Sequence, residues 1–334
     1  MAFEHIPGQA EAARRLVAAL RSGRVPHAYL FVGPAGTGRG AAARELARIL
    51  LCREKTQADA ACGACLSCRA IEAGRHPDYH EIAVPEGKQL LPIEAVRELQ
   101  RSASLKPSLA GGHVFVVRDA ERMSLDAANC FLKTLEEPPP GCTLVLIASS
   151  LRELPETVVS RCWIVRFRNM APDELRARLE ADGLGADEAR WLARQSWGSP
   201  GTAEAMRASE FAGVNRELIA RLAVLSVEDN FALSDWLDAA AGGSGADARI
   251  RLQDLLDCVA AYYRDLAVQA SVGAGEADLV NRAAAGEIRK AAAGAAPEQF
   301  VRRAEQALEA IEWIGANANR RLALDHLFTS LARP

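Results

Sequence analysis

Four cysteines stand close together within the stretch CREKTQADAACGACLSC. They are Cys52, Cys62, Cys65 and Cys68, with nine residues between the first two and two residues between each later pair. Four thiolates grouped in this way suit a closed tetrahedral zinc site, so we expect a structural zinc ion. Disulfides are the alternative, which a reducing compartment disfavours. The other cysteines are isolated and are expected to be small buried residues: Cys130, Cys142, Cys162 and Cys258.

A glycine-rich stretch, GPAGTGRGAA, follows the apolar run Tyr29–Val32. A phosphate-binding loop at this place uses glycine amides around the phosphates, a lysine on the outer phosphates and a Ser/Thr hydroxyl on magnesium. Gly33 and Gly38 keep the glycine pattern, but Arg39 replaces the lysine and Gly40 removes the hydroxyl. The bulky planar guanidinium is a poor substitute for a compact ammonium. We therefore expect no productive ATP binding; a simple glycine-rich turn is the alternative interpretation.

Coding bias offers another explanation for the arginine in this loop. Only five of the 40 basic residues are lysine, so drift from lysine to arginine could account for Arg39 by itself. It does not account for Gly40, which is a second and independent loss.

The stretch HVFVVRDAERMS gives an independent test of nucleotide chemistry. An ATPase of this architecture places one acidic residue at the strand end to hold magnesium and a second one to activate water. Here Arg118 takes the first position and Asp119 the second. A cation at the metal position repels magnesium, so the sequence predicts that hydrolysis is absent. A surface Arg-Asp pair after a strand is the alternative, with the same consequence.

Apolar runs alternate with helical patterns in the first half of the chain. This alternation predicts a mostly parallel sheet covered by helices. The clearest helix is expected over Leu125–Glu137, with Ser124 as its cap and three prolines at its end. After Phe167 the pattern is helical throughout, with long helices expected over Asp254–Ala270 and Pro297–Ala316. The expected strands are Tyr29–Val32, Tyr79–Val84, His113–Val117, Thr143–Ser149 and Trp163–Phe167.

Three domains follow from this pattern: an α/β domain over residues 1–168, a small helical lid over 169–207 and a helical carboxy-terminal domain over 208–334. The chain of 334 residues is long enough for them. With 49% hydrophobic and 25% charged residues and a net charge of -3, it is typical of a soluble protein without a global basic field. It has no apolar run of about 18 residues, so the cytoplasm is the expected location.

Several motifs together resemble the bacterial clamp-loader subunits of the AAA+ superfamily. Their order and spacing match over about the first half of the chain, and the three-domain layout extends the match further. The motifs, besides the glycine-rich loop and the four-cysteine insertion, are IPGQ (Ile6–Gln9), PHAYLF (Pro26–Phe31), NCFLKTLEEPP (Asn129–Pro139) and SRC (Ser160–Cys162).

The resemblance implies an AAA+ P-loop-type domain followed by a lid and an all-α collar domain. The ATP-hydrolysing tau/gamma members keep the loop Lys and Thr, an Asp-Glu pair and a lid arginine that senses the γ-phosphate. This chain departs at Arg39, Gly40, Arg118 and Gly201. It therefore resembles the rigid, non-hydrolysing stator of the DNA polymerase III clamp loader.

That role implies no catalytic activity of the chain's own, but membership of a DNA-directed DNA polymerase holoenzyme, a nucleotidyltransferase. The implied partners are tau/gamma and delta subunits in a hetero-pentamer, the sliding clamp, and primed DNA through the assembled complex, without a membrane. The implied place is the nucleoid-associated replisome in the cytoplasm.

Arg161 acquires a role only through the resemblance. In the family, the arginine of SRC reaches across an interface to the γ-phosphate held by a neighbouring ATPase, as an arginine finger. Outside that context it would be a surface arginine before a strand. The resemblance also implies that Lys133 lies near the DNA chamber. It further implies that the pattern GANANRRLALDHLFTSLA, residues 315–332, is a collar helix that contacts other subunits; an intramolecular helical bundle is the alternative.

Two other functions are compatible with parts of the sequence. One is a clamp-loader ATPase of the tau/gamma type with a variant phosphate loop, against which Gly40 and Arg118 argue. The other is a zinc-based nucleic-acid binder, which requires a basic surface around the cysteines. The charges there are mixed: Glu54, Asp59 and Glu72 beside Arg53, Lys55 and Arg69.

Overall fold

A five-stranded parallel sheet forms the centre of the amino-terminal half, with strand order β2-β3-β4-β1-β5. The structure is a computed structural model and describes residues 2–55, 57–85, 88–109, 111–209, 211–226, 228–243, 245–272, 279–316 and 318–332. The strands are β1 (Ala28–Val32), β2 (Tyr79–Ile82), β3 (His113–Val117), β4 (Cys142–Ala148) and β5 (Trp163–Arg166). All five expected strands are confirmed, although β2 ends two residues earlier than expected.

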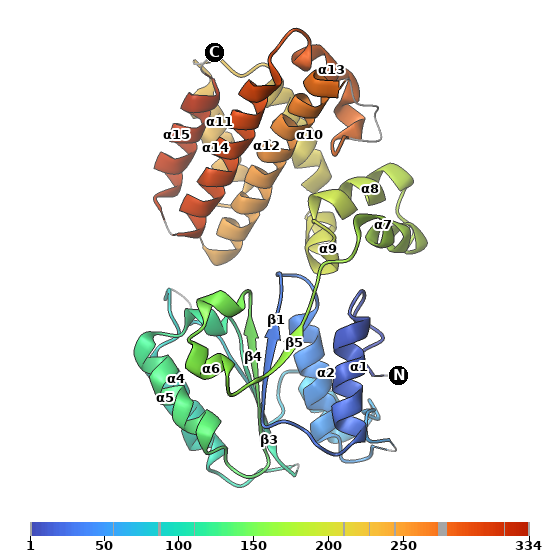
Figure 1. Cartoon of the computed structure of the whole chain (residues 1–334), viewed down its shortest axis with the longest axis vertical. Helices are drawn as coiled ribbons and strands as arrows, with labels where there is room; N and C mark the ends of the chain where they lie inside the picture. The colour runs from blue at the N-terminus through green and yellow to red at the C-terminus, as the bar shows by residue number, and fades with distance from the viewer. Residues whose placement is uncertain are drawn as a thin grey trace. The chain divides into compact units, whose positions relative to one another are not determined.

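Helices cover both faces of this sheet (Figure 1). They are α1 (Ala10–Arg21), α2 (Arg39–Leu51), α3 (Leu66–Glu72), α4 (Ile93–Ala103), α5 (Leu125–Glu136) and α6 (Glu156–Val159). Side chains alternate along β1: Tyr29 and Phe31 enter a core with Leu16 of α1 and Leu46 of α2. Leu30 enters the opposite core, which includes residues of α4 and α5. Burial on both faces explains why the strands are continuous apolar runs.

The ends of α5 follow the signals in its sequence. The Ser124 hydroxyl accepts a hydrogen bond from the Ala127 N–H at 3.1 Å, which satisfies an amide of the first turn. Three prolines after Glu137 prevent continuation, and the helix ends at Glu136, one residue earlier than expected. This helix end restrains the backbone at Glu136.

The chain divides into two compact units. The first contains Met1–Met170 with Ser199–Gly201, and the second contains Ala171–Gly198 with Thr202–Pro334. The second is helical, as expected. It is built from α7 (Pro172–Ala181), α8 (Ala186–Gln195), α9 (Pro200–Ala208), α10 (Phe211–Ala223), α11 (Asn230–Ala240), α12 (Ala246–Val272), α13 (Ala285–Ala292), α14 (Pro297–Gly315) and α15 (Arg320–Leu331).

The last helix packs inside its own unit. Leu324, Leu327 and Phe328 of α15 are buried, and α15 contacts α11 and α14. The apolar face of α15 is therefore largely buried within an intramolecular bundle, in which α12 and α14 make the most extensive helix–helix contact. Among the described helices none combines the length and the apolar character needed to cross a bilayer. The predicted fold class, an α/β domain with a parallel sheet followed by an all-helical region, is confirmed.

Candidate functional site

The carboxyl ends of the parallel strands bring the glycine-rich loop and the Arg118-Asp119 pair to one edge of the sheet. The loop leaves β1, which lies beside β4, while Arg118 follows β3 on the other side of β4. An ideal Cβ built on Gly40 would lie 3.3 Å from Nη2 of Arg118. The two positions that hold magnesium in an ATPase of this design therefore meet, but they bring together a glycine and a guanidinium.

Arg118 is tied to the neighbouring strand. Its backbone N–H donates to the Ile82 carbonyl at 2.8 Å, and its Nη1 lies 3.6 Å from Oε2 of Glu81. Burial raises the pKa of the Glu81 carboxyl, but a hydrogen bond from the Tyr79 hydroxyl, together with Arg44 and Arg118, outweighs burial and lowers that pKa. Arg118 is thus part of an ion-pair network that keeps its positive charge at this edge.

Arg39 opens α2 after Gly38, whose φ of 90° lies in the left-handed region. Its Nη1 donates to the carbonyl of Ala148 at the end of β4, so the guanidinium is turned toward the sheet edge. Burial lowers the pKa of Arg39, and the nearby carboxylates of Glu121 and Asp119 oppose this shift. The lysine position of the loop is therefore filled by a side chain that is already hydrogen-bonded within the protein.

Glycine is required at two positions of the loop because neighbouring atoms lie where a Cβ atom would be. A Cβ on Gly33 would lie 2.2 Å from the Phe167 carbonyl oxygen, and one on Gly38 would lie 2.5 Å from Cγ2 of Ile6. Real Cβ atoms do not approach so closely, and φ at Gly38 adds a backbone reason for glycine. The glycine pattern thus has a packing role here that does not depend on a nucleotide.

The four cysteines of the insertion come together as predicted. Their Sγ atoms all lie within 4.8 Å of one another, with 4.0 Å between Cys52 and Cys65 and 3.9 Å between Cys62 and Cys68. Four sulfurs at about 2.3 Å from a tetrahedral zinc ion are about 3.8 Å apart, so the group fits a zinc site with four thiolate ligands. None of the four sulfurs is in a disulfide.

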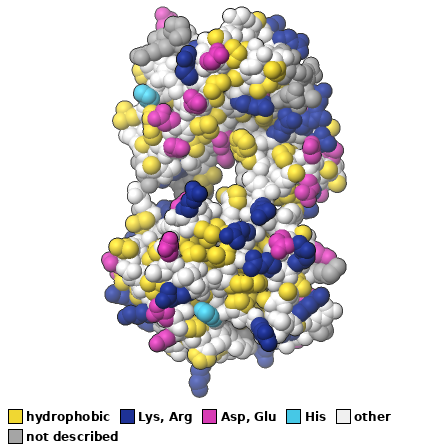
Figure 2. Space-filling view, viewed as in Figure 1, with side chains coloured by type: hydrophobic (Ala, Val, Ile, Leu, Met, Phe, Trp, Pro, Cys, Tyr) yellow, Lys and Arg dark blue, Asp and Glu magenta, His cyan; other side chains and the backbone are white. Residues whose placement is uncertain are grey.

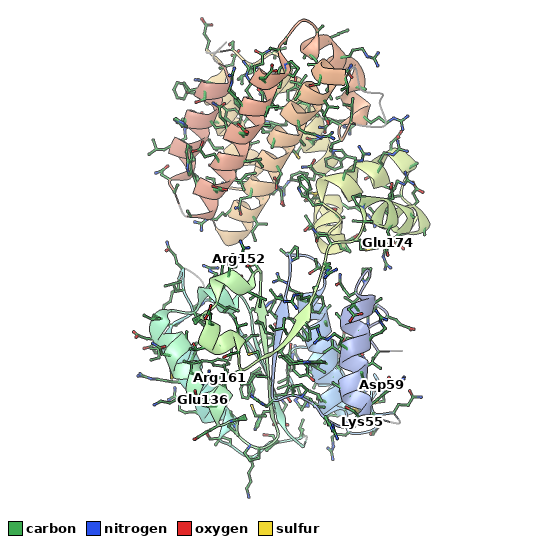
Figure 3. All side chains as sticks on the ribbon, in the orientation of Figure 1. Lys55, Asp59, Glu136, Arg152, Arg161 and Glu174 are labelled. Atoms are coloured by element: carbon green, nitrogen blue, oxygen red, sulfur yellow. The ribbon has the colours of Figure 1, made fainter. Side chains whose placement is uncertain are left out.

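Neighbouring groups shift the pKa values of thiols in this cluster, and the thiolate form is the one that binds a metal. Burial alone raises the pKa of the Cys65 thiol, but N–H donors of Cys68 and Arg53 and the adjacent thiols lower it to about 6. Burial, together with hydrogen bonding to the neighbouring thiols, raises the pKa of Cys68 to about 12, so of these two thiols Cys65 loses its proton more readily. Cys65 caps α3, and Arg21 of α1 holds the loop through Asp59, with 3.0 Å between Nη2 and Oδ2. Asp59 and Lys55 of this loop are labelled in Figure 3.

The other cysteines differ partly from expectation. Cys142 and Cys258 are buried as predicted, but Cys130 and Cys162 are only half-buried. Cys130 lies near the surface of α5, where its Sγ donates to Oε1 of Gln100 at 3.5 Å. Burial raises the pKa of both Cys142 and Cys162 to about 12, so these thiols stay protonated at neutral pH.

Arg161 lies just before β5, on a different element from Arg118 and from the cysteine cluster. Its guanidinium makes an ion pair with Glu136, and 36% of its side-chain area is exposed (Figure 3). The structure therefore presents Arg161 at the surface rather than inside its own loop site. Glu136 and Glu81 are the residues of these sites that sequence reasoning missed.

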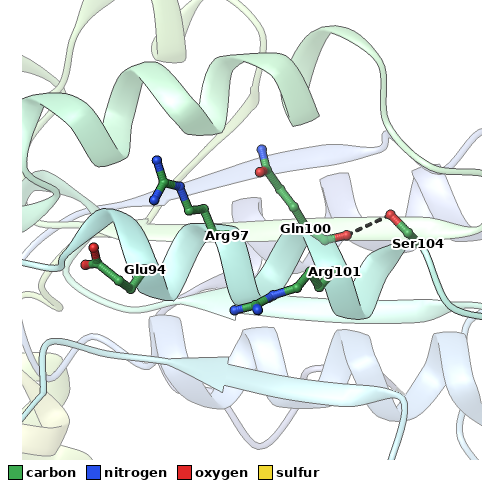
Figure 4. A pocket seen from close by; sticks show the side chains of 5 residues that line it. All are labelled: Glu94, Arg97, Gln100, Arg101 and Ser104. Atoms are coloured by element: carbon green, nitrogen blue, oxygen red, sulfur yellow. Dashed lines mark hydrogen bonds between the residues drawn. The ribbon is translucent and has the colours of Figure 1, made fainter.

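A hollow of about 520 Å³ lies along α4 and contains none of the predicted site residues (Figure 4). Glu94, Arg97, Arg101 and Ser104 recur at helical spacing, so they form the solvent side of α4, opposite the buried Val96 and Leu99. On the face shown in Figure 2, acidic and basic side chains are interspersed over both units. The hollow is therefore a feature of an amphipathic helix surface.

Comparison with known proteins places these features in a family. Residues 8–171 match the family model described as DNA polymerase III, delta subunit. The DNA polymerase III subunit delta prime of Escherichia coli K12 is 34% identical over 256 residues, which are 71% of this chain and 70% of that protein. The delta prime subunit of Bacillus subtilis 168 is 33% identical over 202 residues, or 60% of each chain. Subunit tau of the same organism is 30% identical over 190 residues, or 56% of this chain and 33% of tau.

Proposed function

This chain belongs to the family of DNA polymerase III delta prime subunits, and from that premise we propose that it is the non-hydrolysing stator of a clamp loader. In this role it binds tau/gamma and delta subunits in a hetero-pentamer that places a sliding clamp on primed DNA. The cytoplasmic replisome is the proposed place of action. The proposed stator role rests on the glycine-rich loop and Arg118, and the proposed arginine finger rests on Arg161.

The contact between positions 40 and 118 carries the proposal. Magnesium would need a hydroxyl at the first position and a carboxylate near the second. The chain instead has Gly40 with the Arg118 guanidinium 3.3 Å from its ideal Cβ. The half-exposed Arg118 guanidinium repels a divalent cation through a solvent-screened interaction, and position 40 offers no hydroxyl to bind one, so the two features together disfavour magnesium. Without the cation, ATP loses the partner that neutralises its outer phosphates.

Arg161 is the residue of this chain that we propose takes part in ATP hydrolysis, through its positive charge. A guanidinium suits bidentate contact with phosphate oxygens, and a fixed cation stabilises charge that develops during phosphoryl transfer. Its exposure supports action on the nucleotide of a neighbouring ATPase subunit, which is the proposed arginine-finger role. In this scheme the chain hydrolyses nothing itself and completes the active site of its neighbour.

The cysteine cluster has a structural role in the same scheme. Zinc held by Cys52, Cys62, Cys65 and Cys68 would join the end of α2 to the start of α3, and four sulfurs leave no open coordination position. The helical domain from residue 208 onward is proposed as the collar through which the subunits assemble.

Reconstitution tests this function. The purified chain is mixed with the tau/gamma and delta subunits of the same organism, and assembly and ATP turnover are measured separately. We expect a defined hetero-pentamer that requires this chain, and no ATP hydrolysis by the chain in isolation. Brisk hydrolysis by the isolated chain would instead support the tau/gamma-type ATPase, and failure to assemble would reject the stator role.

A further inference from the structure

Glu136 and Arg161 form an ion pair between the end of α5 and the segment that precedes β5. Nη2 of Arg161 lies 2.6 Å from Oε1 of Glu136, within the distance of a charge-assisted hydrogen bond and at its short end (Figure 3). The two residues are 25 positions apart in the sequence. Their contact therefore depends on the fold of the domain and not on one helix.

The same guanidinium is held by a second element. Nη1 donates to the Thr157 carbonyl of α6 at 2.9 Å and to the Ser160 hydroxyl at 3.4 Å. A guanidinium has five N–H groups, and three are used by Glu136, Thr157 and Ser160. The remaining two have no partner among the residues that the structure describes. The side chain is thus anchored while part of its hydrogen-bonding capacity stays available.

Glu136 can serve as a fixed anchor because its backbone is restrained. Thr134 and Leu135 just before it are buried, and the Glu137 N–H donates to the Lys133 carbonyl at 3.0 Å. The prolines that follow prevent the helix end from extending. The carboxylate therefore projects from a defined point, although the remainder of its side chain is exposed.

Stability does not explain the pair. The side chains of Arg161 and Glu136 are 36% and 49% exposed, and ion pairs at such exposure contribute little to the free energy of unfolding. Orientation is a stronger explanation. A long arginine side chain that is already held near its working position loses less conformational freedom when it meets a phosphate group.

We propose that Glu136 is a positioning residue for Arg161: its carboxylate holds the guanidinium so that the free N–H groups face the phosphates of a neighbouring subunit's nucleotide. This inference rests on the proposed finger role of Arg161. Glu136 itself contacts no substrate and acts through Arg161.

The test compares Glu136→Ala, Glu136→Gln and the control Glu137→Ala in the reconstituted clamp loader. Glu137 is the adjacent exposed acid and has no side-chain partner within the described part of the chain. We expect Glu136→Ala to lower kcat for ATP by about threefold with KM unchanged, because an exposed pair is weak. Glu136→Gln keeps an oxygen acceptor and should lie between Glu136→Ala and wild type. A kcat for Glu136→Ala equal to or above that of Glu137→Ala would overturn the inference.

Double variants separate this inference from the proposed function. In the Arg161→Ala background, Glu136→Ala should have no further effect on kcat, because the residue that it positions is gone. An additional loss there would show a general structural role and overturn the inference. If Arg161→Ala alone leaves kcat unchanged, the finger role itself fails. Gel filtration of each assembly confirms that the variants are compared in the same complex.

Discussion

Gly201 donates its backbone N–H to the carbonyl oxygen of Gly36 at 2.9 Å, which places residues 199–201 against the glycine-rich loop. Ser199 adds a bond from its hydroxyl to the Ala35 carbonyl at 3.0 Å. An ideal Cβ at Gly201 would lie 2.8 Å from that Gly36 oxygen and 2.9 Å from the Gly36 Cα. With this contact in place, a side chain at position 201 has no room, which excludes there the arginine that the resemblance implies for the ATPases.

Substitution of Gly201 should therefore destabilise the protein. Gly201→Ala forces its methyl group into the Gly36 backbone, and we expect the free energy of unfolding to fall by about 1–3 kcal/mol, as in other overpacked sites. Gly213→Ala is the matched control, since Gly213 also lies in a helix and has nothing within 4 Å of an ideal Cβ. It should gain up to about 1 kcal/mol. Denaturant unfolding measures the free energy of unfolding of both variants. Changes of the same sign in Gly201→Ala and Gly213→Ala would contradict the role of the contact with Gly36.

Zinc content tests the cysteine cluster. The purified chain should contain one zinc ion, and Cys62→Ser should lose it and unfold at a lower temperature, because metal binding contributes to the stability of the fold. Cys130→Ser changes a half-buried cysteine outside the cluster and should keep the metal. Elemental analysis with a melting curve provides both measurements. Full zinc occupancy in Cys62→Ser would reject the four-sulfur site.

The ion pairs of Glu81 predict a specific loss of stability in acid. The pKa of Glu81 is lowered in the folded state, so its contribution is fully present above the unfolded pKa of about 4.3 and is lost as the pH falls through the folded pKa. Glu81→Gln removes the titration and should flatten the decline of stability below about pH 4.5. The free energy of unfolding is measured across this pH range for wild type and Glu81→Gln. A decline in Glu81→Gln as steep as in wild type would contradict the prediction.

The sequence was informative wherever local chemistry determines the structure. Continuous apolar runs located the five strands, and Ser124 with three prolines located the ends of α5. C-x-x-C spacing was sufficient for the cysteine cluster, because most of the cluster closes within one short loop and one helix start.

Long-range contacts account for what was missed. The pairing of Glu136 with Arg161 and of Glu81 with Arg118 depends on which strands and helices become neighbours, and no local pattern contains that information. Glu136 belongs to the motif NCFLKTLEEPP, but an exposed glutamate near the end of a helix needs no ion-pair partner, so no feature of the sequence predicts one. Similarly, the sequence shows that Gly201 carries no arginine side chain, but its contact with Gly36 depends on the three-dimensional fold.

The central claim is that this chain contributes Arg161 to the active site of a neighbouring ATPase and uses no nucleotide itself. ATP turnover by the reconstituted assembly with Arg161→Ala tests it most directly, with Arg152→Ala as an exposed control in the same domain. We predict that turnover at the site that Arg161 faces falls by about a hundredfold or more, with the assembly intact and the Arg152→Ala rate unchanged. An intact Arg161→Ala assembly that hydrolyses ATP at the wild-type rate at that site would contradict the claim.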